Sequence, residues 1–327
     1  MIDVSIVIIN YNSDDLLSNC LSSFYKTASG YNFEVIVVDN SNENYHAREI
    51  VLQYPHTKFI KNKTNLGFSL ANNKGIDVSE GKYIVIMNND IIFTENTFKV
   101  LLEYCEASDQ DLMVGCELLN PDGTHQVSIV EFDRPWNIFT ESFFLYKLFP
   151  KSRYFNKYYQ NYITSSEPFE TDVIKGAFMF CNGTLVRELK GFDPNFFFYY
   201  EETDLCYMFK KHGGKIIYYP GTSVIHLGGA TTDNMPWFKF KSQTVSRIKF
   251  FQKHFTGPKF VLSVLLHYTG VLIRIPLYLM NGLLTRKKFH FYKAYYYFKQ
   301  LFIYSKYSHD LRNEKNSDTV RYETRSN

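Results

Sequence analysis

Two motifs in the sequence carry carboxylates in positions where they could take part in a reaction. Asn88-Asn89-Asp90 follows a strongly apolar stretch, and an acid placed there can bind Mg²⁺ or Mn²⁺ together with diphosphate oxygens. The alternative is an ordinary turn, because Asn and Asp favour turns. Glu201-Glu202-Thr203-Asp204 follows the aromatic run 196–200, whose rings would desolvate a carboxylate and raise its pKa towards that of a useful general base. The alternative is helix capping, since acids favour helix N-termini.

Asp39 and His226 are single residues with two interpretations each. Asp39 ends an apolar run, so its carboxylate could accept a hydrogen bond from a nucleotide base or could simply cap a turn. His226 precedes Leu227-Gly228-Gly229 and could be a metal ligand, although a lone histidine is more often structural. Position alone does not decide between these interpretations, so both residues stay candidates.

Several common classes of site are disfavoured by the motifs. Asn10-Tyr11-Asn12 stands where a dinucleotide-binding enzyme has the glycine turn GxGxxG, which argues against an NAD-dependent enzyme. Residues 75–82 are one residue too long for a Walker A loop, and Tyr83 replaces its Ser or Thr. The five cysteines are scattered without a CxxC pair. Neither a disulfide framework nor a structural zinc site is therefore indicated, and reduced cytosolic thiols are expected.

Alternating strands and helices must position the candidate residues. Strands are predicted at 4–10, 34–39, 58–61, 82–88 and 111–118. Helices are predicted between them at 13–24, 44–54, 68–78 and 94–107. The N-terminal apolar run of about nine residues suits a strand rather than a signal peptide or a membrane span. Strand–helix alternation gives a mostly parallel sheet with helices on both faces, so residues that follow its strands are expected at one ligand-binding edge.

The second half of the chain is less regular. Residues 134–164, after the turn Asn120-Pro121-Asp122-Gly123, show no period and are expected to form an insertion or flexible loop. The remaining predictions begin with a strand at 170–181 and a region at 195–212 that ends in a helix. Two short strands, 215–219 and 222–226, are split by Pro220-Gly221, and the part from 237 onward is helical.

The formal net charge of +3 hides a strong segregation of charge. Residues 1–233 contain 19 Lys and Arg against 29 Asp and Glu, whereas residues 234–309 contain 13 Lys and Arg and no acid. Residues 310–327 carry four of each sign. We therefore predict an α/β domain over 1–233, a basic amphipathic helical segment over 234–309 and a polar, disordered tail over 310–327.

The basic segment 234–309 needs an anionic partner, either a membrane surface or a nucleic acid. No nucleic-acid motif is present and the basic residues lie in an apolar, aromatic region, so no nucleic-acid partner is expected. Residues 260–284 are largely apolar, but Arg274 stands near their middle, where an arginine is costly inside a bilayer. Association with an anionic membrane surface is therefore predicted. The alternative is that these helices pack on the rest of the protein as ordinary core.

Taken in chain order, the motifs resemble those of family 2 glycosyltransferases with the GT-A fold, particularly the rhamnosyltransferase-like branch of bacterial surface-polysaccharide (O-antigen) synthesis. The matching segments, which span residues 3–255, are 4–12, 38–41, 65–68 with Asn73 and Gly75, 87–90, 175–177, 191–193 with Phe197 and Tyr200, 201–205 and His226. The resemblance implies a Rossmann-like sheet with a sugar-donor half, residues 1–118, and an acceptor half, residues 119–233.

The resemblance also implies a role for each matching residue. Asp39 would contact the nucleotide base, and the sugar-donor site would comprise Asn10, Tyr11, Asn12, Asp39, Asn65, Gly67, Asn73, Asn88 and Asn89. Asp90 and His226 would bind a divalent metal, Mg²⁺ or Mn²⁺. Glu202 would be the general base, and Glu201 and Asp204 would position the acceptor or the helix. The sequence departs from the family pattern at two places. Asp90 is the one acid left in the DxD-type motif. Glu201-Glu202 replaces a frequent Glu-Asp, which leaves open which acid is the base.

The implied reaction is an inverting transfer of a sugar from a nucleotide-diphosphate donor to a saccharide or a polyprenyl-diphosphate-linked saccharide. The favoured donor is dTDP-rhamnose, and the alternatives are a UDP-hexose or a UDP-N-acetylhexosamine. A catalytically weak sugar-nucleotide-binding subunit of an assembly is the alternative of a different class. The expected location is cytoplasmic and peripheral, at the inner face of the plasma membrane, and a homodimer through the C-terminal helices is a further hypothesis.

Overall fold

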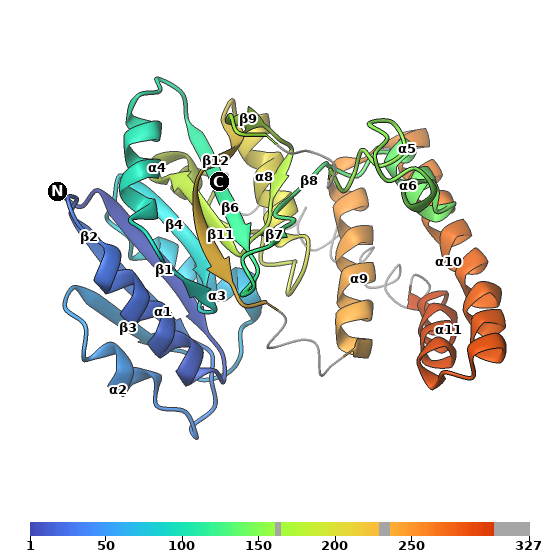
Figure 1. Ribbon diagram of the computed structural model, residues 1–327, viewed down its shortest axis with the longest axis horizontal. Coiled ribbons are helices and arrows are strands. Elements are labelled where there is room, and N and C mark those ends of the chain that lie inside the picture. The colour runs from blue at the N-terminus through green and yellow to red at the C-terminus, as the bar shows by residue number, and fades with distance from the viewer. Residues whose placement is uncertain (161–164, 229–235, 304–327) are drawn as a thin grey trace, which may run out of the picture. The chain divides into compact units, whose positions relative to one another are not determined.

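The structure, a computed structural model, describes residues 1–160, 165–228 and 236–303 (Figure 1). The contacts within the chain divide it into one unit of residues 1–133 and 150–233 and a second unit of residues 134–149 and the chain from 234 onward. The tail predicted for 310–327, the end of the predicted basic segment at 304–309 and part of the predicted loop at 161–164 lie outside the described residues.

A ten-stranded sheet with both parallel and antiparallel pairs lies at the centre of the first unit, counted over the described residues. The strands of the chain are β1 (Val4–Asn10), β2 (Phe33–Asp39), β3 (Thr57–Lys61), β4 (Tyr83–Asn88), β5 (Ile91–Ile92), β6 (Leu112–Leu119), β7 (His125–Gln126), β8 (Ile129–Val130), β9 (Phe169–Glu170), β10 (Val173–Ile174), β11 (Phe178–Asn182) and β12 (Lys215–His226). The main order is β3-β2-β1-β4-β11-β6-β12-β5, with β7 on β6 and β9 on β12, while β8 and β10 form a separate pair.

The four strands β3, β2, β1 and β4 are parallel, so their carboxyl ends share one edge of the sheet. β11 runs antiparallel to both β4 and β6, and β5 runs antiparallel to β12. β1, β2 and β4 are mostly apolar and buried along nearly their whole length, as strands between two layers of helices must be. β3, at the edge of the sheet, is half-buried or exposed. This arrangement confirms the predicted α/β class with a mostly parallel part.

Helices cover both faces of the sheet (Figure 1). The helices of the first unit are α1 (Asp14–Thr27), α2 (Ala47–Val51), α3 (Gly67–Asp77), α4 (Thr97–Glu106), α7 (Gly183–Glu188) and α8 (Glu201–Lys211). α1 and α4 share a core with the β1 residue Ile6. On the other face, α3 lies so near β1 that a Cβ on Gly75 would stand 2.4 Å from Val7 Cγ1. α8 covers that same face, where Cys206 Sγ lies 3.6 Å from Met113 Sδ.

Three of the local predictions differ from the structure in pairing or in length. The strand expected over 170–181 is three short strands, because β9 pairs with β12, β10 pairs with β8, and β11 pairs with both β4 and β6. The two strands expected around Pro220-Gly221 form the single strand β12, whose register shifts between Tyr219 and Ser223. The helix expected over 44–54 is the short helix α2.

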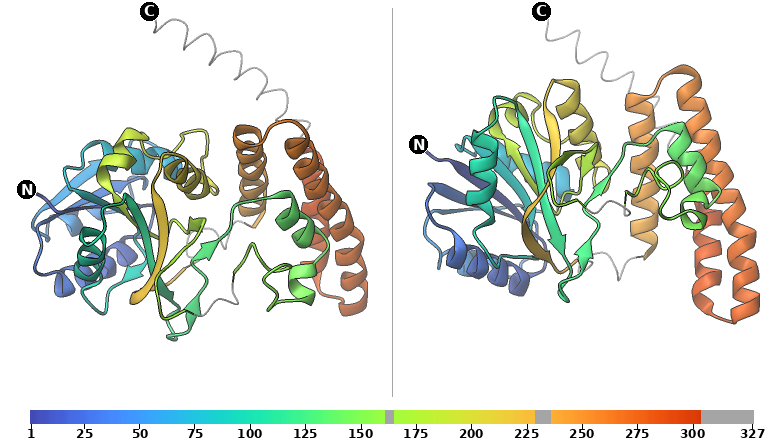
Figure 2. Two further views of the ribbon diagram at one scale, coloured as in Figure 1. Left: turned by 90° about the horizontal axis from the view of Figure 1, so that it is seen from above. Right: turned by 45° about the horizontal axis from the view of Figure 1, so that its top comes forward.

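The second unit is helical. It consists of α5 (Pro135–Ser142), α6 (Leu145–Leu148), α9 (Pro236–His254), α10 (Gly257–Thr285) and α11 (Lys288–Gln300), and α10 and α11 lie side by side (Figure 2). The helical character predicted from Trp237 onward is confirmed over the described residues. The insertion or flexible loop predicted for 134–164 is corrected over Pro135–Ser142 and Leu145–Leu148, where α5 and α6 form. Pro135 at the first position of α5 favours a helix start.

Arg274 is held by polar contacts within the second unit. Its guanidinium donates to the carbonyl oxygens of Glu141 at 2.8 Å and Gly270 at 2.9 Å, and it lies 4.5 Å from the ring centroid of Phe144. The Glu141 carboxylate pairs with Arg247 at 2.6 Å. Among the described residues, α10 is the helix that is long and apolar enough to cross a membrane, judged by length and composition alone.

Candidate active site

Buried amide and carboxylate side chains meet where β1, β2 and β4 end. Asn10, at the end of β1, donates from Nδ2 to Asp39 Oδ1 at 3.2 Å and to Ser41 Oγ at 3.3 Å. Its Oδ1 accepts a hydrogen bond from Asn89 Nδ2 at 2.7 Å. Three residues predicted for the sugar-donor site, Asn10, Asp39 and Asn89, are thus brought together from three strand ends, which are the usual ligand-binding edge of a parallel sheet.

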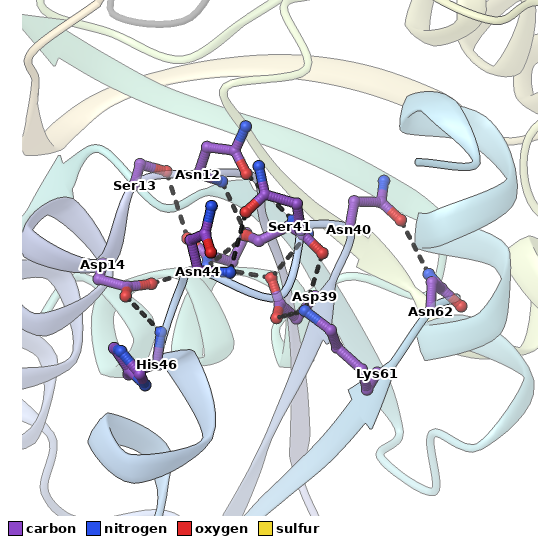
Figure 3. Close-up of polar contacts among 12 residues, drawn as sticks. Asn12, Ser13, Asp14, Asp39, Asn40, Ser41, Asn44, His46, Lys61 and Asn62 are labelled. Atoms are coloured by element: carbon purple, nitrogen blue, oxygen red, sulfur yellow. Dashed lines mark hydrogen bonds and ion pairs between the residues drawn. The ribbon is translucent and has the colours of Figure 1, made fainter. Parts of the chain in front are cut away.

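The carboxylate of Asp39 is engaged on both of its oxygens, and the side chain is 1% exposed. Lys61 Nζ lies 2.7 Å from Oδ2, and the Ser41 backbone N–H donates to Oδ1 at 3.0 Å (Figure 3). The parallel register of β2 and β3 places Asp39 opposite Lys61. Sequence reasoning missed Lys61, because a lysine at a strand end has no local signal that separates it from an ordinary surface residue.

The loop after β1 is tied to the loop after β2. Asn12 has a left-handed backbone, with φ 52°, and its N–H donates to Ser41 Oγ at 2.7 Å (Figure 3). Its Oδ1 accepts from the Asn42 N–H at 3.2 Å. The neighbouring Tyr11 is half-buried, and its carbonyl oxygen accepts from Ser13 Oγ at 3.1 Å. These contacts fix the backbone that leads into α1.

The start of α3 holds the segment that precedes α8. Gly67 has φ 79°, and a Cβ there would stand 2.7 Å from the Phe197 ring, so glycine is required for this approach. Asn65 Oδ1 accepts from the Gly67 N–H at 2.9 Å. The Asn73 amide makes two hydrogen bonds to the backbone of Phe192, at 2.7 and 2.8 Å. Gly67 and Asn73 therefore support this segment, a role that the sequence prediction did not include.

Asp90 and His226 lie next to each other, after β4 and at the end of β12. His226 Nε2 is 3.3 Å from Asp90 Oδ1, and Asn88 Nδ2 is 3.4 Å from the same nitrogen. Asp90 Oδ2 accepts from the Gly228 N–H at 3.1 Å. Asp90 Oδ1 is buried and has no hydrogen-bond partner among the residues that the structure describes.

The Asp90–His226 pair fits two ligands of a divalent cation. A carboxylate oxygen and an imidazole nitrogen are ligand types that Mn²⁺ accepts, and a buried, unpartnered oxygen is an atom that a bound cation would satisfy. In the described ranges, no group of three or more His, Cys, Asp or Glu side chains is arranged to hold a metal. A cation held by this pair would therefore complete its coordination with diphosphate oxygens and water.

Three acids occupy the first turn of α8. Glu201 and Asp204 are buried, whereas Glu202 is half-buried. The Oε2 atoms of both glutamates have no hydrogen-bond partner in the described part of the chain. Burial, with repulsion from Glu202, raises the pKa of Glu201 well above its usual range. Burial also raises the pKa of Glu202, while backbone hydrogen bonds and the charge of Lys175 oppose part of that rise.

The entry into α8 is conformationally unusual. Tyr199 and Tyr200 are both left-handed, with φ 66° and 67°, and this region is sparsely populated by residues with a Cβ. Tyr200 Oη donates to Asp133 Oδ2 at 2.6 Å, so a distant carboxylate holds the turn. Two consecutive strained residues persist only where the surroundings determine them. The turn directly precedes Glu201 and Glu202 and sets their position.

Glu202 is also connected to the end of β4. A Cβ on Gly176 would stand 3.5 Å from Glu202 Cβ. The next residue, Ala177, accepts at its carbonyl oxygen a hydrogen bond of 3.1 Å from the Asn88 N–H. The motifs at 88–90, 175–177 and 201–204, which are far apart in sequence, therefore lie in neighbouring parts of one unit.

The chain is similar to known glycosyltransferases. The sequence model described as "Glycosyl transferase family 2" matches residues 5–180, more than half of the chain. The uncharacterized glycosyltransferase MJ1057 of Methanocaldococcus jannaschii is 34% identical over 117 residues, which are 34% of this chain and 40% of that protein. The chain thus spans about two fifths of the length of that relative.

Two comparisons extend over more of the chain. An N-acetylglucosaminyl-diphospho-decaprenol L-rhamnosyltransferase of Mycobacterium tuberculosis is 23% identical, with 71% of this chain and 78% of that protein aligned. The crystal structure of GalNAc-T7 with UDP, GalNAc and Mn²⁺ superposes with a TM-score of 0.52 at 17% identity, over 69% of this chain and 43% of that one. This likeness in fold and the family match confirm the GT-A fold class predicted from the motifs. The chain belongs to glycosyl transferase family 2.

Proposed function

We propose that the protein is a metal-dependent, inverting glycosyltransferase that uses a nucleotide-diphosphate sugar. The observation that carries the proposal is the approach of His226 Nε2 to within 3.3 Å of Asp90 Oδ1, a buried oxygen that accepts no hydrogen bond from the described residues. The pair lies beside the amide network of Asn10, Asp39 and Asn89. Membership of the family supports the same reaction class.

Asp90 and His226 would hold Mg²⁺ or Mn²⁺, and Asp39 would face the nucleotide base. A divalent cation bound there supplies charge that stabilises the leaving diphosphate, a contribution of about several kcal/mol. Asn10 and Asn89 keep the strand ends together, so that the nucleotide site is formed before the ligand arrives. Lys61 adds a positive charge next to Asp39.

Glu202 is the proposed general base. It accepts the proton of an acceptor hydroxyl as that oxygen forms its bond to the anomeric carbon, and the carbon–oxygen bond to the diphosphate breaks on the opposite face. The raised pKa of its carboxyl group, caused by burial, makes Glu202 a stronger base than an ordinary glutamate. The buried Glu201 and Asp204 position the first turn of α8 and the acceptor.

The favoured sugar donor is dTDP-rhamnose, supported by the likeness to a relative named as an L-rhamnosyltransferase. A hexose donor is the alternative, supported by a hexosyltransferase of low-salt glycan biosynthesis from Haloferax volcanii, Agl10, which is 23% identical with 64% of this chain and 62% of that protein aligned. The proposed acceptor is a saccharide or a lipid-linked saccharide in cell-surface polysaccharide synthesis.

We also propose that the second unit associates with an anionic membrane surface from the cytoplasmic side. Large apolar side chains stay exposed along α10 and α11, among them Leu265, Leu272, Leu283, Phe289 and Phe298. The described helices of this unit carry many Lys and Arg residues, and aromatic residues beside cations suit a lipid interface. The contacts of Arg274 with α5 favour a peripheral position over a span. A homodimer that covers these side chains is the competing proposal.

Calorimetric titration with dTDP, UDP and GDP, each with and without Mn²⁺, tests the proposed site. We expect one diphosphate to bind in a Mn²⁺-dependent way, and Asp90→Ala to lose this binding. Asp109→Ala, which removes an exposed carboxylate, is the matched control and should bind as the wild type does. If a folded wild-type protein binds none of the diphosphates, the site assignment fails. Hydrolysis of the sugar donor without acceptor separates a transferase from a subunit that only binds.

A further inference from the structure

A chain of hydrogen bonds leads from the exposed turn after β6 to the imidazole of His226. Thr124 Oγ1 lies 2.6 Å from Asp122 Oδ1, and Asn120 Nδ2 lies 2.9 Å from Thr124 Oγ1. Gln126 Nε2 lies 2.9 Å from Asn120 Oδ1. At the end of the chain, Gln126 Oε1 lies 2.6 Å from His226 Nδ1. Four side-chain contacts thus connect the turn, β7 and the end of β12.

The direction of the first hydrogen bonds is fixed by chemistry. The hydrogen bonds from Thr124 lower the pKa of Asp122, so its carboxylate stays ionised and can only accept. The Thr124 hydroxyl therefore donates to Asp122 and accepts from the amide of Asn120. The same Asn120 Nδ2 is 3.5 Å from the carbonyl oxygen of His125, which also can only accept. Asn120 must then turn its Oδ1 towards Gln126.

The orientation of Gln126 follows from two acceptors. Its Nε2 faces Asn120 Oδ1 and also lies 3.3 Å from the carbonyl oxygen of His226, and neither oxygen can donate. The amide oxygen of Gln126 consequently faces His226 Nδ1. Because that oxygen is an acceptor, Nδ1 of His226 must carry the proton.

A neutral His226 with its proton on Nδ1 has its lone pair on Nε2, the nitrogen 3.3 Å from Asp90 Oδ1. We infer that Gln126 is a positioning residue, which holds His226 as the Nδ1–H tautomer so that Nε2 and Asp90 Oδ1 face the same cation. This inference rests on the proposed metal site. Metal-ligating histidines use the hydrogen bond of their other nitrogen to fix the tautomer and the ring orientation.

The tautomer can be measured in the metal-free protein. Long-range ¹H–¹⁵N correlations distinguish the two neutral forms of an imidazole, and comparison with His226→Gln assigns the His226 signals. We expect the Nδ1–H form in the wild type. Gln126→Met keeps the side-chain length but removes the acceptor, so it should lose this preference, whereas Gln126→Glu keeps an acceptor oxygen and should retain it. A wild-type His226 in the Nε2–H form overturns the inference.

Affinity for Mn²⁺ alone, measured by electron paramagnetic resonance of the free ion, gives the second readout. Gln126→Met should weaken Mn²⁺ binding by about 10–100-fold, the range found when the partner of a metal-bound histidine is removed. Gln126→Glu should rescue most of that loss, which a purely structural role for the amide does not predict. Gln110→Met, at an exposed glutamine, is the control and should bind as the wild type does.

The outcomes separate this inference from the proposed function. Unchanged Mn²⁺ affinity in a folded Gln126→Met protein, with binding in the wild type, overturns the role of Gln126 and leaves the transferase proposal intact. If the wild type binds diphosphates but no Mn²⁺, the metal site fails, and the ligand role of His226 fails with it.

Discussion

Lys61 Nζ lies 2.7 Å from Asp39 Oδ2, across the last register pair of β2 and β3. The two side chains differ strongly in exposure, since Asp39 is 1% exposed and Lys61 is 40% exposed in its side chain. The ion pair is therefore open to solvent on one side only. Removal of the lysine would leave a buried carboxylate without its cation. This loss destabilises the fold by more free energy than the intact ion pair contributes.

Lys61→Met should lower the free energy of unfolding by about 1–3 kcal/mol, because Asp39 loses its charged partner. The matched control is Lys63→Met, which changes an exposed lysine two residues further along and should alter stability by about 0.5 kcal/mol or less. Urea denaturation at neutral pH measures both. Equal effects of the two substitutions would show that the Asp39–Lys61 contact does not stabilise the fold.

Glu202→Gln should lower kcat by about 10²–10⁴-fold, with little change in the affinity for the nucleotide diphosphate, because a positioned base is lost and the nucleotide site is not. Glu201→Gln should lower kcat less, since Glu201 is the more buried of the two residues. Steady-state kinetics together with diphosphate titration separate the two glutamates. A larger loss in Glu201→Gln would assign the base to Glu201.

The acid limb of the kcat/KM profile should lie above the ordinary pKa range of a glutamate. Burial raises the pKa of Glu202, and the base works only when deprotonated, so activity is lost as the pH falls through this raised value. A pH–rate profile of the wild type measures the limb. A limb at the pKa of an exposed carboxylate would contradict the assignment of Glu202 as the base.

Glu201→Gln should make stability less dependent on pH in the window above the ordinary pKa of a glutamate. The pKa of Glu201 is raised in the folded state by burial. The folded state therefore binds more protons than the unfolded state in that window, and the stability of the wild type falls as the pH rises. A neutral amide removes this loss, so the difference in Tm between variant and wild type should grow with pH. Glu188→Gln, at an exposed glutamate of the same unit, should leave the pH dependence unchanged.

Leu272→Glu with Leu283→Glu should weaken binding to vesicles that contain phosphatidylglycerol by about tenfold or more, because two exposed apolar contacts become anionic. The wild type should sediment with these vesicles and release them in high salt. Leu52→Glu, on an exposed leucine of the first unit, is the control. If the double variant binds as the wild type does, the exposed face of α10 is not the lipid contact, and a monomer–dimer measurement then tests the competing proposal.

The sequence predicts the first half of the sheet well, because β1, β2 and β4 are continuous apolar runs buried on both faces. It also places Asn10, Asp39 and Asp90 correctly at strand ends, since the position after a strand is a local property. Sequence analysis misses Lys61, Asp133 and Gln126 for one physical reason. Each acts on a residue that only strand pairing or tertiary packing brings near, and an isolated Lys, Asp or Gln has no local pattern.

The errors in the second half have a related cause. An apolar run over 170–181 indicates a strand, but it does not indicate that three parts of this run pair with different strands. The helices α5 and α6 were missed because their aromatic residues follow no clear period. In both cases the contacts with distant residues outweigh the local preference.

The length of the turn before the two-residue strand β7 determines which side chain of β7 faces His226. β7 pairs with β6 through Leu119 opposite His125 and Leu118 opposite Gln126, and successive side chains on a strand point to opposite faces. A single residue added between 120 and 124 would therefore exchange the faces of His125 and Gln126. Exposed turns usually tolerate insertions. In this turn, an insertion that leaves the fold intact would still separate Gln126 from His226, so tags and linkers belong elsewhere on the chain.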